Sequence, residues 1–282
     1  MPTFTDPFGV VISYDQYPKT ARKAPPKAII QIAHGIGEHA GRYTALARAL
    51  VTAGFGVYVA DMRGHGRTGM QQFADDTTQL GHLGAGGLRA AIGNISQLSD
   101  IIRQEHPGIP VVLLGHSMGS LLAQKLINTH ASDYAEVILS ATAYRMPGSM
   151  ESGNLNKKFA FEGSTTHEWL SRDPKVVEAF EADPLTFDAE VLKLFGLVDG
   201  LRLFGVPSYD MDQVPILIIL GSRDPLGGEK SALKLAKAYT KTAAQNDVTV
   251  TVYPEARHEL FNETNRKEVI ADMIAWIKSR LA

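Results

Sequence analysis

The chain has 282 residues, of which 44% are hydrophobic and 21% charged, so it is long and apolar enough to bury a large core. Its formal net charge of −2 excludes the basic surface of nucleic-acid-binding proteins and of basic membrane anchors. The absence of cysteine excludes disulfides and thiolate chemistry. No apolar run approaches the roughly 18 residues that span a bilayer. Residues 1–10 lack the basic and apolar regions of a signal peptide, so we expect a cytoplasmic protein.

The first half of the chain alternates between strand-like and helix-like patterns. Short apolar runs predict strands at 10–14, 28–33, 55–60, 111–114 and 137–140. Amphipathic spacing predicts helices at 43–53, at 88–106 and from 118 to about 130. Residues 61–66 are rich in turn-forming residues and predict a loop. This alternation is typical of an α/β protein with a doubly wound, mostly parallel sheet.

The alternation breaks between residues 144 and 207, where irregular and helical patterns carry no strand signal. It resumes with strands predicted at 216–220 and 248–253 and helices at 229–239 and 267–281. The sequence therefore predicts a core made of residues 1–143 and 208–282, with residues 144–207 inserted as a helical cap or lid.

The most informative motif is Gly115-His116-Ser117-Met118-Gly119, which directly follows the apolar run at 111–114. It predicts a strand, a sharp turn and a helix, with Ser117 at the tip of the turn. Glycines suit the flanking positions because a Cβ there would clash with neighbouring backbone. Ser117 is therefore the candidate nucleophile of a hydrolase.

A serine nucleophile needs a base, and the base needs an orienting carboxylate. In a parallel sheet, functional groups gather beyond the carboxyl ends of the strands. Asp224 and His258 follow the last two predicted strands, so we expect them to lie with Ser117. Their joint occurrence in the order Ser, Asp, His carries this prediction. Glu255 and Glu259 are alternative carboxylates for the histidine.

Acyl transfer also requires two N–H donors that stabilise the oxygen of the tetrahedral intermediate. The Met118 amide is the first candidate because it directly follows the serine. The second candidate is the Ile36 amide, in the glycine-containing turn at 34–38 that follows the strand at 28–33.

Two further motifs add to this pattern. Residues 34–43 read His-Gly-Ile-Gly-Glu-His-Ala-Gly-Arg-Tyr, and residues 61–66 read Asp-Met-Arg-Gly-His-Gly. Together with the motif around Ser117 and with His258, they resemble the monoacylglycerol lipase and lysophospholipase branch of the α/β-hydrolases. The likeness covers nearly the whole chain, including residues 169–173 and 183–185 of the insertion.

The resemblance implies an α/β-hydrolase fold with a triad of Ser117, Asp224 and His258 and with oxyanion amides from Ile36 and Met118. It implies hydrolysis of a carboxylic ester through an acyl-enzyme intermediate, with a glycerol-like or small polar leaving group. It also implies that neither a metal nor a cofactor takes part.

The insertion carries a dense apolar stretch between residues 192 and 206, interrupted by glycines. Its side chains Phe195, Leu197, Leu201 and Phe204 are the candidate lining of an acyl-chain site. The alternative is that these residues only pack the insertion onto the core.

The sequence thus predicts a serine hydrolase that cleaves esters of monoacylglycerols or lysophospholipids. One alternative is another acyl-transfer hydrolase on this fold, such as a small-ester carboxylesterase, a peptidase or a perhydrolase. A second alternative is a protein that binds an apolar ligand without catalysis. As partners we expect a small lipid-like ester, no nucleic acid and no transmembrane segment, with transient contact between the insertion and a membrane surface.

Overall fold

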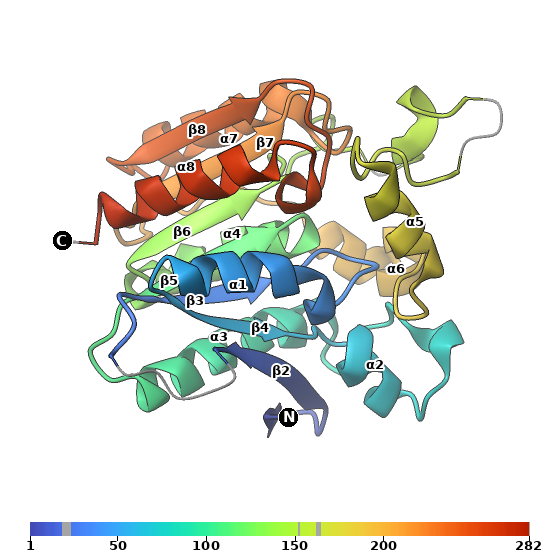
Figure 1. Ribbon diagram of the computed structural model, residues 1–282, viewed down its shortest axis with the longest axis horizontal. Coiled ribbons are helices and arrows are strands. Elements are labelled where there is room, and N and C mark those ends of the chain that lie inside the picture. The colour runs from blue at the N-terminus through green and yellow to red at the C-terminus, as the bar shows by residue number, and fades with distance from the viewer. Residues whose placement is uncertain (19–23, 152, 162–164, 282) are drawn as a thin grey trace.

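The computed structural model describes residues 1–18, 24–151, 153–161 and 165–281 (Figure 1). Among these residues, eight strands form a sheet in the order β1-β2-β4-β3-β5-β6-β7-β8. They are β1 (Thr3–Thr5), β2 (Val11–Tyr17), β3 (Ile29–Ala33), β4 (Gly56–Ala60), β5 (Val111–His116), β6 (Glu136–Ser140), β7 (Ile216–Gly221) and β8 (Val248–Tyr253). β1 and β4 pair antiparallel with β2, and the other neighbours are parallel. The predicted fold class is therefore confirmed.

Helices cover both faces of the sheet (Figure 1). One face carries α1 (Thr44–Thr52) and α8 (Arg266–Lys278), and the other carries α3 (Gly87–Glu105), α4 (Met118–His130) and α7 (Gly228–Lys241). In β3, Ile30 and Ile32 pack with α1 and α8, whereas Ile29 packs with the opposite layer. Strands buried on both faces read as continuous apolar runs, which is why the sequence predicts them well. None of the helices in the described residues combines the length and the apolar composition that a membrane crossing requires.

One helix begins where the predicted loop at 61–66 ends, in a segment for which the sequence makes no helix prediction. The turn-rich residues 61–66 lead directly into α2 (Gly66–Gln72), which has no apolar stripe. Tertiary contacts stabilise this helix instead: the Thr68 hydroxyl accepts the Ser13 N–H over 2.9 Å. A Cβ at Gly69 would lie 2.6 Å from the carbonyl carbon of Gly64, so the helix packs closely against the preceding turn.

Between β6 and β7 the described residues form no strand. This segment contains a 3₁₀ helix (Leu155–Lys158), α5 (Pro174–Ala182) and α6 (Val191–Arg202). Figure 1 shows α5 and α6 beyond the carboxyl ends of the parallel strands. The Gly205 N–H donates to the Arg145 carbonyl over 2.9 Å, so the chain leaves the core and returns to it at one point. α6 bends at Gly196, whose φ of 70° and ψ of 173° are not helical.

Candidate active site

Ser117 stands at the sharp turn between β5 and α4. Its φ of 50° and ψ of −119° lie outside the regions that L-residues normally adopt, so the surrounding structure must hold this conformation. The Ser117 N–H donates to the Ser140 carbonyl of β6 over 2.9 Å, and the Gly119 N–H donates to the His34 carbonyl over 3.1 Å. A Cβ at Gly119 would lie 2.1 Å from the Ala33 carbonyl oxygen, which explains the glycine. Two neighbouring strands therefore fix the turn.

A buried histidine and aspartate lie at the same end of the sheet. Nδ1 of His258, after β8, is 2.9 Å from Oδ1 of Asp224, after β7. The two side chains are 3% and 1% exposed. Burial lowers the pKa of His258, but the negative charges of Asp224, Glu259 and Glu38 outweigh burial and raise this pKa above its ordinary value. The site therefore stabilises the imidazolium form of His258 more than water does, with Nδ1–H facing a carboxylate.

The two alternative carboxylates have other partners. Glu255 Oε2 lies 3.1 Å from Nη1 of Arg223 on the surface. The Glu259 carboxylate receives both ends of the Arg42 guanidinium, over 2.5 Å and 2.9 Å. The structure therefore brings Asp224 to His258 and leaves these two glutamates in different ion pairs.

Two further rings surround the imidazole of His258. The ring of His116 has its centroid 5.0 Å away, and the ring of Trp169, from the insertion, lies 4.8 Å away. Burial and the neighbouring His258 lower the pKa of His116 to about 3, so it is neutral. No hydrogen bond joins the Ser117 hydroxyl to His258 within the described part of the chain, and such bonds commonly form or shorten only when substrate is bound. The sequence motifs did not single out Trp169 or His116 as neighbours of the histidine.

The two candidate oxyanion donors flank Ser117. Met118 is the first residue of α4. Among the described residues, neither its N–H nor the N–H of Ile36 donates a hydrogen bond. The turn that contains Ile36 lies directly against the serine, because a Cβ at Gly35 would be 3.2 Å from the Cβ of Ser117. Two free N–H donors on either side of a serine can receive a developing oxyanion.

The four apolar candidates of the insertion do not share one environment. Phe195 is half-buried and packs against the core. Phe204 is half-buried too, but its carbonyl lies 3.5 Å from Nζ of Lys125, about two helical turns along α4 from Ser117. Leu197 and Leu201 are 68% and 58% exposed.

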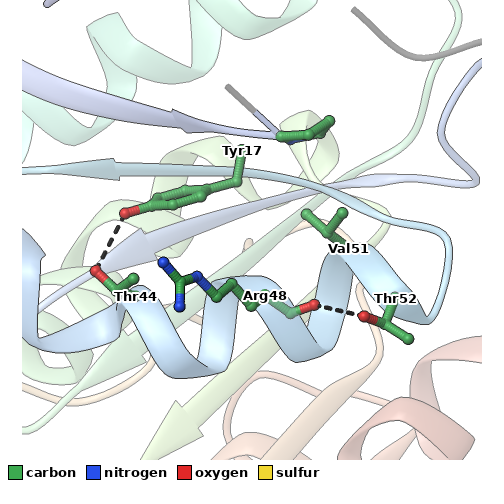
Figure 2. Close-up of a pocket in the computed structure, with 6 residues that line it drawn as sticks. Tyr17, Thr44, Arg48, Val51 and Thr52 are labelled. Atoms are coloured by element: carbon green, nitrogen blue, oxygen red, sulfur yellow. Dashed lines mark hydrogen bonds between the residues drawn. The ribbon is translucent and has the colours of Figure 1, made fainter. Parts of the chain in front are cut away.

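A surface groove of about 470 Å³ lies between the end of β2 and α1, and Figure 2 shows its lining. The lining residues are Tyr17, Pro18, Thr44, Arg48, Val51 and Thr52. Tyr17 and Thr44 interact through their hydroxyls over 3.2 Å. None of these residues is a histidine or a carboxylate that could serve as a base, so the groove offers no arrangement for hydrolysis.

Comparison with known proteins gives the family. The family Hydrolase_4, described as Serine aminopeptidase, S33, matches residues 24–265. The chain belongs to this family. A monoacylglycerol lipase of Mycolicibacterium smegmatis is 30% identical to this hydrolase, and the match covers 97% of this chain and 95% of the relative. The human monoglyceride lipase is 28% identical over 91% of this hydrolase and 84% of the relative.

A solved structure has the same fold. The carboxyl esterase of Bacillus coagulans, in complex with glycerol, matches this hydrolase with a TM-score of 0.84 at 23% identity. The match covers 100% of this chain and 98% of the esterase, which shows the α/β-hydrolase fold. Family and relatives together make this protein a serine hydrolase that acts on esters.

Proposed function

We propose that this hydrolase cleaves carboxylic esters of monoacylglycerols through an acyl-enzyme intermediate on Ser117. Relatives named monoacylglycerol lipase and monoglyceride lipase support this substrate class. The observation that carries the mechanism is the 2.9 Å contact between Nδ1 of His258 and Oδ1 of Asp224, at the sheet end that also bears Ser117. A lysophospholipid substrate and a cytoplasmic location stay predictions from the sequence.

The geometry supports the following steps. The Ser117 hydroxyl attacks the ester carbonyl while Nε2 of His258 takes its proton. Asp224 keeps the other imidazole N–H oriented and stabilises the imidazolium. The N–H groups of Ile36 and Met118 receive the negative charge on the carbonyl oxygen. The imidazolium then protonates the leaving glycerol oxygen. In the second half, His258 takes a proton from a water that attacks the acyl-enzyme, and it returns this proton to the Ser117 oxygen as the fatty acid leaves.

Residues 144–207 form the cap of this site in our proposal. The Trp169 carbonyl accepts the His258 N–H over 3.3 Å, and the Leu170 carbonyl accepts the next N–H along the chain over 2.7 Å. These contacts tie the insertion to the loop that bears the base. The half-buried Phe195 is the best supported acyl-chain contact of the four candidates, while the outward apolar side chains of α6 suit transient contact with a lipid surface.

Replacing the nucleophile tests the mechanism. Ser117→Ala should lower kcat by up to ~10⁶-fold, because the triad acts as a unit. Fatty acid release from a monoacylglycerol and from a p-nitrophenyl ester measures the loss, and a fluorophosphonate probe should label the wild type but not this variant. Ser279→Ala, at the far end of α8, is the matched control and should keep full activity. Hydrolysis that persists in a pure Ser117→Ala preparation would contradict a mechanism with Ser117 as the nucleophile.

A further inference from the structure

Three charged side chains are buried together behind the candidate oxyanion turn. Arg42 contacts both oxygens of Glu259, and its Nη1 also lies 3.2 Å from Oε2 of Glu38. The side chains of Arg42, Glu38 and Glu259 are 10%, 5% and 5% exposed. Burying such charges costs desolvation energy that their mutual attraction often only offsets, so this ion pair is a poor explanation of stability.

One end of this network holds the oxyanion turn. Oε1 of Glu38 accepts the N–H of Gly35 over 2.6 Å and the O–H of Tyr43 over 2.7 Å. Gly35 immediately precedes Ile36 and lies against Ser117. The Glu38 carboxylate therefore orients the peptide that leads into the Ile36 amide.

The other end holds the loop of the base. Glu259 directly follows His258, and its Oε2 also accepts an amide N–H of Asn262 over 2.9 Å. Among the described residues, the pairing of Arg42 with Glu259 is the only hydrogen-bonded link between residues 34–43 and residues 255–263. Arg42 and Glu259 are 217 residues apart in the sequence.

We propose that Arg42 is a positioning residue that sets the separation between the Ile36 amide and the His258 imidazole, acting through Glu38 and Glu259. The proposal rests on the proposed function, because that separation matters only if both groups serve the same tetrahedral intermediate. A misplacement of about 1 Å in such a geometry costs about 100-fold in rate. Arg42 itself touches neither the candidate nucleophile nor the base through a hydrogen bond among the described residues.

The two glutamates of the network also act on the pKa of His258, which the pH dependence of catalysis can report. The charged groups of the described residues that act on His258 are Asp224, Glu259 and Glu38, with Arg42 paired to both glutamates and the neutral His116 ring beside the imidazole. Burial lowers the pKa of His258, and Asp224, Glu259 and Glu38 raise it. Removing the charge of Glu259 should therefore shift the acid limb of the kcat/KM profile to lower pH, which loss of packing alone would not do.

Two variants and one control test the positioning role. Arg42→Lys keeps the charge but cannot span both oxygens of Glu259, and Glu259→Gln keeps the size but removes the charge. With a soluble p-nitrophenyl ester, each should lower kcat by about 10- to 100-fold with little change in KM, since substrate contacts are intact. Arg280→Lys is the control, because it breaks a similar two-point contact, with Asp247 over 2.7 Å and 3.0 Å, at the opposite end of the sheet. It should leave kcat unchanged.

The outcomes separate this proposal from the proposed function, which Ser117→Ala tests without reference to Arg42. Thermal unfolding first shows that each variant is folded. A folded Arg42→Lys or Glu259→Gln protein with wild-type kcat overturns the positioning role, and so does a loss confined to KM. An unmoved acid limb in Glu259→Gln overturns it too. If Arg42→Lys does not fold, Glu259→Gln decides the matter alone.

Discussion

At the scale of single residues, partner choice distinguishes the three carboxylates near the end of β8. Asp224 is buried against the imidazole, Glu255 lies on the surface with Arg223, and Glu259 binds Arg42. A carboxylate that faces the Nδ1–H of the base fixes its tautomer and stabilises its charged form. Only the first of these three is placed to do so.

Replacing Asp224 by asparagine should therefore lower kcat and keep the fold. Oδ1 of Asp224 accepts the Leu226 N–H over 3.0 Å, which an amide oxygen can also do, while Oδ2 has no hydrogen-bond partner in the part of the chain that the structure describes. We expect kcat to fall by ~10⁴ with an unchanged circular dichroism spectrum. Glu255→Gln is the matched control. A near wild-type Asp224→Asn beside an inactive Glu255→Gln would identify a different acid.

The sequence could predict where Ser117, Asp224 and His258 lie because each comes within a few residues of the carboxyl end of a strand of a parallel sheet. It could not predict the pairing of Arg42 with Glu259. The two residues are 217 positions apart, and neither periodicity nor a strand end relates them. From the sequence Glu259 is an alternative acid because it directly follows His258, and only the structure shows its pairing with Arg42.

At the scale of elements, α6 has two apolar faces with different surroundings. Phe195 points toward the core, whereas Leu197 and Val198 are exposed. The non-helical Gly196 separates Phe195 from these two residues and redirects the chain between them. In our proposal Phe195 contacts the acyl chain, whereas Leu197 and Val198 on the other face contact lipid.

Two substitutions in α6 should have separable effects. Val198→Ser removes exposed apolar surface, so activity on monoacylglycerol in phosphatidylcholine vesicles should fall by about tenfold, since burying a valine contributes about 1.5 kcal/mol. Activity on a dissolved short-chain ester should not change. Phe195→Ala should instead move the chain-length optimum of dissolved p-nitrophenyl esters to longer chains, because each CH₂ buried contributes about 0.8 kcal/mol.

Both variants are measured on monoacylglycerol in vesicles and on dissolved p-nitrophenyl esters, so each variant is the control for the other. An identical chain-length profile in Phe195→Ala and the wild type would leave that side chain with a packing role only. Equal losses on vesicles and in solution for Val198→Ser would show that the outer face does not contact lipid.

Elements with a strong apolar pattern were predictable, and those held by tertiary contacts were not. The central strands β3, β5, β6 and β7 are mostly apolar because helices cover both faces of the sheet. α2 contains Gly66 and Gly69 and no apolar stripe, so its sequence resembles a loop. Its contacts with Ser13 and with the turn before it become visible only in the folded chain.

At the scale of the whole molecule, the two ends of the sheet differ in character. β6 ends at Ser140, which holds the turn of the candidate nucleophile, and begins at Glu136 on the opposite edge. The Glu136 side chain is buried, and neither carboxylate oxygen has a hydrogen-bond partner within the described residues. Burial raises the pKa of Glu136 to about 8, against the opposing charge of Arg280. This group bears on stability rather than on catalysis.

The molecule should therefore lose stability as pH rises through the neutral range. The folded state keeps the Glu136 proton up to about pH 8, whereas the unfolded chain releases it near its ordinary pKa of 4.5. The stabilisation is complete below about pH 4.5 and is lost as the pH approaches 8. Glu136→Gln should raise Tm at pH 8 and change it little at pH 5. The expected rise is about 2–4 °C for each kcal/mol by which the substitution increases the free energy of unfolding. The same gain in Tm at both pH values would contradict this origin.

The hydrogen bond between Gly205 and Arg145 has a consequence for how this enzyme can diverge. Because the two ends of the excursion at 146–204 meet, its length can change without altering the register of β6 against β7. Closing a longer loop adds only about 0.6 kcal/mol for each doubling of its length. Insertions and deletions in this segment should therefore leave the sheet intact, provided that the contacts of Trp169 and Leu170 with the loop of His258 are kept. Evolution, or an engineer grafting part of the segment from a relative, can change its length and select a new ester while the register of the sheet stays as it is.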